Sequence, residues 1–379
     1  MAALPRRIFG RCGATEQEGA QVRLCELQGP RGDRDVEETA DRRNHFDASD
    51  GSDETVRRQT LGAQVMEIRN LGKSGLRVSA IGLGCNNFGG RLDLEATRTV
   101  VHAAFDQGIT LFDTADVYGD RGGSESLMGE VLGTMRKDIV LATKFCMPMA
   151  DDGAKQGASR RYIVSAVEAS LRRLKTDYID LYQQHRQDPL TPIEETLRAL
   201  DDLVRAGKVR YIGCSNFPAW TMVEAQWTAK TAGLNPFVSC QDEYSLVVRD
   251  AERNLVPAAR AYGMGLLPYF PLASGLLTGK YRRNASMPIG ARLTQTQRLA
   301  DRYLNDRNWQ ISEKLIDFAE SHGHTALELA FSWLLAQAPV ASVIAGATRL
   351  EQVAQNVKAG NWAMTPADLT EIDAITQAV

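Results

Sequence analysis

Long apolar runs are absent from this sequence, and cysteine and histidine are scarce. No stretch approaches the ~20 consecutive apolar residues that a membrane-spanning helix needs, so we expect no insertion into a membrane. The six cysteines are scattered without a CxxC pair, and the five histidines form no spacing typical of metal ligands. In a chain of 379 residues this pattern predicts reduced thiols in a cytoplasmic protein and no bound metal.

An excess of charge of one sign is also lacking. The chain has 44 Lys and Arg against 47 Asp and Glu, which leaves a formal net charge of -3. Without a strong field there is no general attraction to nucleic acid or to an anionic membrane, and we expect neither as a partner. The 44% of hydrophobic residues is enough to fill a sizeable core.

The first 65 residues differ in composition from the rest. They contain no Lys, Trp or Tyr and hardly any apolar periodicity, so they cannot bury enough surface to offset the entropy of ordering. They lack the apolar core of a signal peptide, and their many acidic residues argue against an organellar transit peptide. The sequence predicts a disordered or non-native extension over residues 1–65 and one folded domain over residues 66–379.

From residue 66 onward, short β-rich segments alternate with amphipathic helical segments. A glycine-containing turn joins residues 66–70 to residues 76–79 and predicts a hairpin. Apolar residues at helical spacing predict the helices, as with Ile163, Val164, Val167 and Leu171. The expected strands are residues 80–84, 110–113, 139–144, 178–183, 209–215, 237–242, 265–270 and 342–345, and the expected helices include residues 94–106, 160–174, 193–206 and 220–231.

Strands that alternate with helices imply a parallel sheet, either doubly wound or closed into a barrel. A dinucleotide-binding doubly wound sheet needs a glycine fingerprint after its first strand, but Asn87 stands where the third glycine belongs. Eight strands and no domain-splitting linker favour the barrel. We therefore predict an α/β fold, a (β/α)₈ barrel of the TIM type with an N-terminal β-hairpin and a C-terminal helix.

Polar side chains stand at the ends of consecutive expected strands. These residues are Asp113, Lys144, His185, Ser215 with Asn216, and Gln241. Barrel enzymes place their catalytic groups at the carboxyl ends of the strands. A polar group that projects into the barrel mouth is costly unless partners share it. The strand ends therefore predict one shared site.

Several longer stretches follow one another in a specific order. They are GITLFDTADVYG (residues 108–119), SESLMG (124–129), LATKF (141–145), DLYQQHR (180–186), GKVRYIGCSNF (207–217), PLASGLLTGK (271–280) and VIAGAT (343–348). Together they resemble the aldo-keto reductase family, in the branch of bacterial aldo/keto reductases and potassium-channel β-subunits. The resemblance covers residue 66 to the C-terminus. It implies a TIM barrel plugged by the hairpin, and an oxidoreductase that uses NADPH to reduce an aldehyde or ketone to an alcohol.

The resemblance implies a catalytic tetrad of Asp113, Tyr118, Lys144 and His185. Carbonyl reduction requires a hydride at carbon and a proton at oxygen, and a tyrosine with a pKa of about 10 is a poor donor at neutral pH. We expect the Lys144 ammonium to lower the pKa of Tyr118, which then acts as general acid. Asp113 would orient Lys144, and His185 would hydrogen-bond the substrate carbonyl.

The resemblance also implies a set of contacts to NADPH. Ser215, Asn216 and Gln241 are expected at the nicotinamide carboxamide, with Tyr269 near the ring. The other expected contacts are Cys85, Asp113, Pro271, Leu272, Lys280, Arg292, Gly346, Thr348, Gln352 and Asn356. Strict NADPH users often carry a basic residue at the position of Gln352. We therefore expect Arg349 or Arg292 at the 2′-phosphate, and NADH as a weaker alternative.

Two other functions compete with the reductase. A non-catalytic regulatory subunit that senses the cofactor could tolerate an altered tetrad, and here all four residues are intact. A lyase or isomerase with Lys144 as a Schiff-base lysine would leave Tyr118 and the carboxamide residues without a joint purpose. Residues 280–306 predict a cover over the cofactor, with a solvated insertion as the alternative. Neither the particular carbonyl substrate nor the oligomeric state follows from the sequence.

Overall fold

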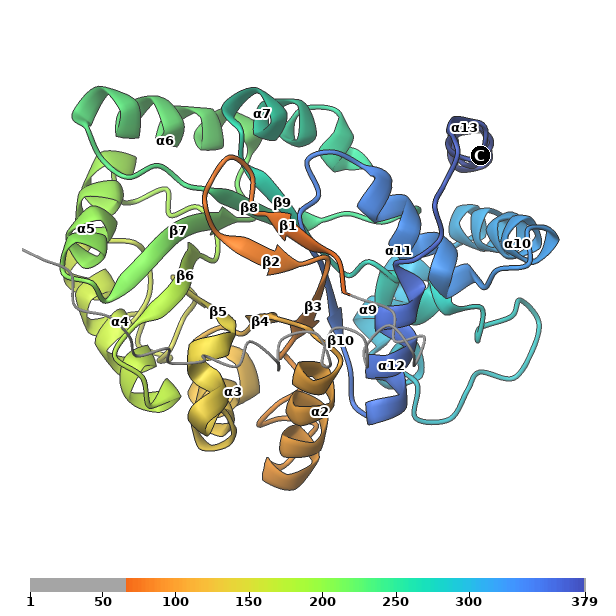
Figure 1. Ribbon diagram of the computed structural model, residues 1–379, viewed down its shortest axis with the longest axis horizontal. Helices are drawn as coiled ribbons and strands as arrows, with labels where there is room; N and C mark the ends of the chain where they lie inside the picture. The colour runs from red at the N-terminus through yellow and green to blue at the C-terminus, as the bar shows by residue number, and fades with distance from the viewer. Residues whose placement is uncertain (1–65, 378–379) are drawn as a thin grey trace, which may run out of the picture. The chain divides into compact units, whose positions relative to one another are not determined.

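A computed structural model describes residues 66–377 of the chain, and the extension predicted for residues 1–65 lies outside them. Within the described part, a short hairpin precedes strands that alternate with helices (Figure 1). The strands are β1 (Ile68–Asn70), β2 (Arg77–Ser79), β3 (Ile81–Gly84), β4 (Leu111–Asp113), β5 (Val140–Phe145), β6 (Ile179–Gln184), β7 (Val209–Ser215), β8 (Ser239–Glu243), β9 (Gly265–Tyr269) and β10 (Val343–Gly346).

Helices surround the strands (Figure 1). The α-helices are α2 (Leu94–Asp106), α3 (Tyr118–Val131), α4 (Arg160–Leu174), α5 (Ile193–Arg205), α6 (Ala219–Ala232), α7 (Leu255–Tyr262), α8 (Arg292–Gln295), α9 (Gln297–Tyr303), α10 (Asp306–Ser321), α11 (Ala326–Ala336), α12 (Leu350–Ala359) and α13 (Pro366–Gln377). Short 3₁₀ helices are η1 (Gly133–Asp138), η2 (Asp250–Glu252) and η3 (Ala273–Thr278).

The strands from β3 to β10 form one parallel sheet in the order β10-β3-β4-β5-β6-β7-β8-β9. Its two edges meet just before β10, where Leu266 pairs with Val340 in a parallel bridge. The backbone N–H of Leu266 donates to Pro339 O at 3.0 Å, and that of Ala341 donates to Leu266 O at 2.9 Å. The sheet is therefore a nearly closed eight-stranded barrel, and the predicted fold is confirmed.

The hairpin of β1 and β2 closes one end of this barrel. Leu71 and Val78 are fully buried and belong to the same apolar cluster as Leu111 and Leu181, which point inward from the barrel strands. The turn needs glycine at position 72, where φ is 61° and a Cβ would collide with the neighbouring backbone of residues 263–265. With this end filled, the carboxyl ends of the strands are the open end of the barrel.

Helix α4 illustrates how the periodic pattern becomes a packed element. Ile163, Val167 and Leu171 are buried against the barrel, as their spacing predicts. Val164, at the edge of the apolar face, remains 44% exposed. The hydroxyl of Ser159 accepts from the Tyr162 N–H at 3.3 Å and caps the first turn.

Two segments bear directly on the site. Tyr118 stands at the start of α3, but residues 119–122 have positive φ and non-helical angles, so an irregular turn separates Tyr118 from the regular part of the helix. Residues 280–306 contain α8 and α9 and bury the side chains of Tyr281, Leu293 and Tyr303. The alternative of a wholly solvated insertion is therefore wrong, because this stretch contributes to the core.

Candidate active site

A cavity of about 1210 Å³ opens at the carboxyl ends of the barrel strands. It gathers every site residue predicted from the sequence except Lys144, whose side chain is fully buried. The predicted residues that line it are Cys85, Asp113, Tyr118, His185, Ser215, Asn216, Gln241, Tyr269, Pro271, Leu272, Lys280, Arg292, Gly346, Thr348, Gln352 and Asn356. Residues far apart in the sequence thus share one concave surface, which is typical of a ligand site.

Lys144 joins two of the predicted catalytic groups. Its Nζ donates to Asp113 Oδ2 at 2.6 Å, to the backbone O of Thr114 at 2.9 Å and to Tyr118 Oη at 3.4 Å. The ion pair with Asp113 is buried on both sides. All three hydrogens of the ammonium are therefore directed to oxygen atoms, and two of the acceptor residues, Asp113 and Tyr118, line the cavity.

The protonation of this pair follows from burial and charge together. Burial lowers the pKa of Lys144, but Asp113 and Tyr118 act more strongly in the opposite direction, so the pKa lies above its ordinary value. Burial raises the pKa of Tyr118, and Lys144 opposes this only in part. Lys144 thus acts on the pKa of Tyr118 in the expected direction, but loss of water outweighs this charge and the net pKa lies above its ordinary value.

His185 is neutral in this environment. Burial lowers its pKa to about 3, with further contributions from the positive charges of Lys144 and Arg186. Its backbone N–H donates to Phe145 O at 2.9 Å, and its ring meets that of Tyr118 edge to face at 5.7 Å between centroids. The Nδ1 atom has no hydrogen-bond partner among residues 66–377. A neutral imidazole next to a tyrosine hydroxyl is suited to binding a carbonyl oxygen.

Gln183 was missed by the sequence predictions. It lies on β6, is fully buried, and its Nε2 donates to Asp113 Oδ1 at 3.1 Å. Gln241 Nε2 donates to the same oxygen at 2.9 Å. The signal that could have found Gln183 is the strand alternation, because it stands two residues before His185 and so faces the same side of the strand.

The predicted carboxamide residues form a connected network at the ends of β7 and β9. Asn216 Nδ2 donates to His185 O at 2.9 Å and to Ser215 Oγ at 3.0 Å. The hydroxyl of Tyr269 donates to Asn216 Oδ1 at 2.8 Å. Asn216 has a φ of 55°, a left-handed conformation that turns its side chain back over the strand ends.

Positive side chains surround the other part of the cavity. Arg91, Lys280, Arg292 and Arg349 all line it, and none has an acidic partner within the described residues. Burial lowers the pKa of Lys280, and the charges of Arg349 and Arg91 lower it further. Burial and Arg91 likewise lower the pKa of Arg292. Cations held together without an acidic partner favour a polyanionic ligand.

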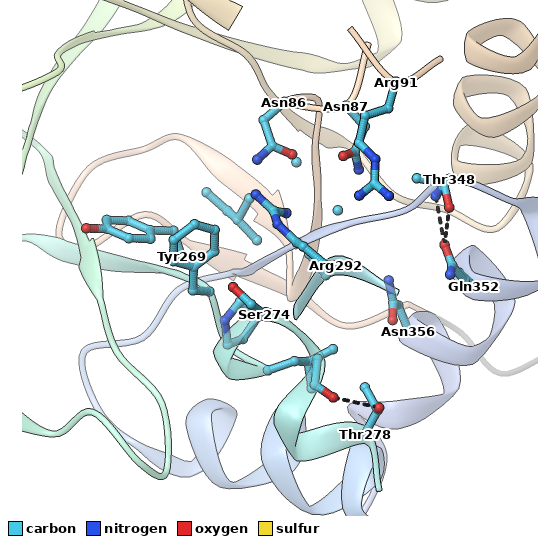
Figure 2. A pocket seen from close by; sticks show the side chains of 18 of the residues that line it. Asn86, Asn87, Arg91, Tyr269, Ser274, Thr278, Arg292, Thr348, Gln352 and Asn356 are labelled. Carbon is cyan, nitrogen blue, oxygen red and sulfur yellow. Dashed lines mark hydrogen bonds between the residues drawn. The ribbon is translucent and has the colours of Figure 1, made fainter. Parts of the chain in front are cut away.

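Figure 2 shows two of these cations, Arg91 and Arg292, together with Thr348 and Gln352 of the last βα loop and α12. Arg292 points into the middle of the cavity, between Tyr269 on one side and Arg91 on the other. Gln352 Oε1 accepts from the N–H of Thr348 at 2.8 Å and from its Oγ1 at 3.1 Å, so the amide of Gln352 organises the loop before α12 (Figure 2). Arg91 was not predicted, and its Nη2 donates to Gln295 Oε1 on α8 at 2.8 Å.

The described residues contain no group of three or more His, Cys, Asp or Glu placed to hold a metal ion. Within the same part of the chain, no helix is long and apolar enough to cross a membrane. Cys85, Cys146, Cys214 and Cys240 are buried free thiols. The groups that could act on a ligand are therefore the tetrad, the amides beside it and the unpaired cations.

A barrel with a buried lysine–aspartate pair, a tyrosine and a neutral histidine at its open end belongs to a known class of oxidoreductases. The family model of the aldo/keto reductase family matches residues 80–377, and the chain belongs to this family.

The relatives bear different names. The chain is 39% identical over 305 residues to the uncharacterized oxidoreductase YrpG of Bacillus subtilis, which covers 78% of this chain and 91% of that protein. It is 37% identical to a probable voltage-gated potassium channel subunit beta of Arabidopsis thaliana, over 83% of this chain and 97% of the relative. It is 35% identical to the L-glyceraldehyde 3-phosphate reductase of Escherichia coli, over 81% and 92% respectively.

Proposed function

We propose that this protein reduces an aldehyde or ketone to an alcohol with NADPH, in the cytoplasm, and that Tyr118 supplies the proton. The supporting observation is Lys144, whose Nζ contacts both Asp113 Oδ2 and Tyr118 Oη while it is fully buried. Bound in the cavity, the nicotinamide cofactor would supply the hydride. The remaining chemistry belongs to side chains of this chain.

Each member of the tetrad then has one task. His185, neutral at physiological pH because its pKa is about 3, donates a hydrogen bond to the carbonyl oxygen and orients the substrate. Tyr118 gives its proton to the same oxygen as negative charge develops there. Lys144 stabilises the phenolate that remains, and Asp113 keeps Lys144 charged and directed at Tyr118.

NADPH is preferred over NADH in this proposal because of the unpaired cations. Arg91, Lys280, Arg292 and Arg349 exceed what a pyrophosphate alone would neutralise, and a 2′-phosphate adds further negative charge. Gln352 uses its oxygen on Thr348, which leaves its Nε2 to donate to a phosphate or ribose oxygen. Asn356 lies on the same helix, α12, and faces the same cavity.

The competing functions fit less well. A Schiff-base mechanism needs a neutral lysine, whereas the pKa of Lys144 is raised by Asp113 and Tyr118 despite its burial. A regulatory subunit that senses the cofactor is supported by the relatives named as potassium channel subunits beta. That alternative does not explain why a tyrosine that lines the cavity is backed by a buried lysine.

The test is NADPH oxidation, followed by absorbance, with a panel of small aldehydes that includes phosphorylated ones. The relative named L-glyceraldehyde 3-phosphate reductase is the reason to include these. We expect Tyr118→Phe and Lys144→Met each to lower kcat by about 10²-fold or more, because general acid catalysis contributes that much. NADPH should bind the wild type more tightly than NADH.

Cofactor binding by both variants is the control, measured by fluorescence quenching. Retained binding with lost turnover supports Tyr118 as proton donor. A wild type that binds NADPH but turns over nothing in the panel would favour the regulatory subunit instead.

A further inference from the structure

The Asp113 carboxylate is held by three donors from three different strands. Lys144 on β5 donates a hydrogen bond to Oδ2, while Gln183 on β6 and Gln241 on β8 both donate to Oδ1. Gln183 is fully buried and does not itself line the cavity, but it hydrogen-bonds to Asp113, which does. Its position behind the site raises the question of what its amide contributes.

We propose that Gln183 is a positioning residue that, together with Gln241, keeps Asp113 ionised and thereby keeps Lys144 an ammonium beside Tyr118. This inference rests on the proposed reductase function.

A buried carboxylate–lysine pair can be either charged or neutral. In a site that excludes water, a proton can pass from Lys144 to Asp113 and leave two neutral groups, since burial penalises both charges. Amide N–H groups on Oδ1 stabilise only the ionised carboxylate. Two such donors at 3.1 and 2.9 Å therefore keep the pair in its charged form.

The same contacts set the orientation of the Gln241 amide. Its Nε2 donates to Asp113 Oδ1 and lies 3.5 Å from Gln183 Oε1, so both of its hydrogens point inward. Gln241 also lines the cavity, and its Oε1 is the atom left to accept a hydrogen bond there. The carboxamide NH₂ of a nicotinamide is a donor that this oxygen fits. Gln183 thus links the proton donor to the carboxamide acceptor through Asp113.

Other ionisable groups face the pair from neighbouring elements. Cys85 after β3, Asp116 before α3 and His185 after β6 interact with the pair itself. Tyr269 on β9 and Arg292 on α8 interact with Tyr118. Burial raises the pKa of Cys85 well above its ordinary value, so it stays a thiol. Gln183 hydrogen-bonds to none of them within the described residues, so its replacement tests Asp113 and Gln241 alone.

The test compares Gln183→Leu with Gln184→Leu, which removes the next amide of the same strand. Gln184 is also buried, and its Oε1 has no hydrogen-bond partner in the described part of the chain. Without the Gln183 donor, Lys144 loses charge and the pKa of Tyr118 rises. Because reduction needs protonated Tyr118, the pH at which kcat declines on the alkaline side should rise by about one unit. The value of kcat should be about tenfold lower, because Tyr118 is then a weaker acid. In Gln184→Leu the pH at which kcat declines on the alkaline side should equal that of the wild type.

A second readout needs no turnover. The Kd for NADPH, measured by fluorescence quenching, should rise several-fold in Gln183→Leu relative to Gln184→Leu, because the Gln241 amide is freed to rotate. A folded Gln183→Leu protein whose alkaline limb and NADPH affinity equal those of Gln184→Leu overturns the proposal. If circular dichroism finds the Leu variant unfolded, Gln183→Met makes the same test with an unbranched side chain.

These outcomes are distinct from failure of the proposed function. A wild type without turnover rejects the reductase, whereas the binding comparison still tests the link between Gln183 and Gln241.

Discussion

At the scale of single residues, burial decides which site groups carry charge. Lys144 keeps its charge because Asp113, 2.6 Å away, and Tyr118 raise its pKa despite burial, while His185 is neutral because burial and two nearby cations lower its pKa to about 3. Cys85 stays a thiol because burial raises its pKa. The site thus combines a buried ammonium with a neutral imidazole and a neutral phenol, a combination that suits the proposed carbonyl reduction.

The low pKa of His185 makes stability depend on pH. An unfolded histidine binds a proton below pH 6.5, but in the folded protein His185 does so only near pH 3. Protons therefore favour the unfolded state in this window, and the free energy of unfolding should fall as the pH decreases from about 6.5 toward 3. His185→Asn should reduce the loss between pH 7 and pH 5 by on the order of 1 kcal/mol, measured by urea denaturation. His102→Asn, at an exposed position on α2, is the control. An equal loss in wild type and His185→Asn would contradict the assignment.

At the scale of secondary-structure elements, α3 is placed by its contact with α4. Glu125 on α3 is fully buried and bonds both Thr143 on β5 and Arg173 on α4. Gly129 allows the two helices to approach, since a Cβ there would overlap Arg173 O. Residues 119–122 form a non-helical turn between Tyr118 and the regular part of α3, so the packing of this helix on α4 also anchors the turn next to Tyr118.

Gly129→Ala should therefore destabilise the protein although alanine is the better helix former. The added methyl group must push α3 from α4, which costs about 1–3 kcal/mol in a packed interior. Gly123→Ala is the matched control on α3, because its nearest neighbour would lie at an ordinary 3.4 Å. Denaturant unfolding measures both. The packing argument fails if Gly129→Ala is as stable as Gly123→Ala.

At the scale of the whole molecule, the two ends of the barrel have separate tasks. The hairpin fills one end with Leu71, Leu76 and Val78, and the cavity occupies the carboxyl ends of the strands. Stability and ligand binding therefore depend on different residues. This separation is general among barrels of this kind.

Leu71→Ala tests the separation. The side chain is fully buried, so its truncation should lower the free energy of unfolding by about 2–5 kcal/mol. The Kd for NADPH at 25 °C should stay within about twofold of the wild-type value, because Leu71 does not line the cavity. A large loss of affinity in the folded variant would mean that the two ends are coupled.

Much of the fold could be predicted from periodicity. The strand expected at residues 139–144 is β5, Val140–Phe145, and the helix expected at residues 94–106 is α2 with the same bounds. The helices within residues 280–306 could not be predicted from periodicity. Helices α8 and α9 have only four and seven residues, too short for a periodic signal, and they form where Leu293 and Leu299 find buried positions.

The residues of the candidate site could mostly be predicted from the sequence, but the hydrogen bonds between them could not. Polar residues at strand ends converge in any parallel barrel, so Asp113, His185 and Gln241 were expected together. Arg91 lies in the loop after β3, and its approach to α8 depends on how two distant segments pack.

The sequence alone determined the alternation of strands and helices, because side-chain periodicity is a local property, and with it the end of the barrel where the polar residues gather. The family also followed from ordered motifs. Only the tertiary structure decided that Gln183 and Gln241 share one oxygen of Asp113, that a non-helical turn follows Tyr118, and that His185 is neutral. Protonation and hydrogen bonding depend on distances of a few ångströms and on the exclusion of water, and both exist only once remote segments have packed.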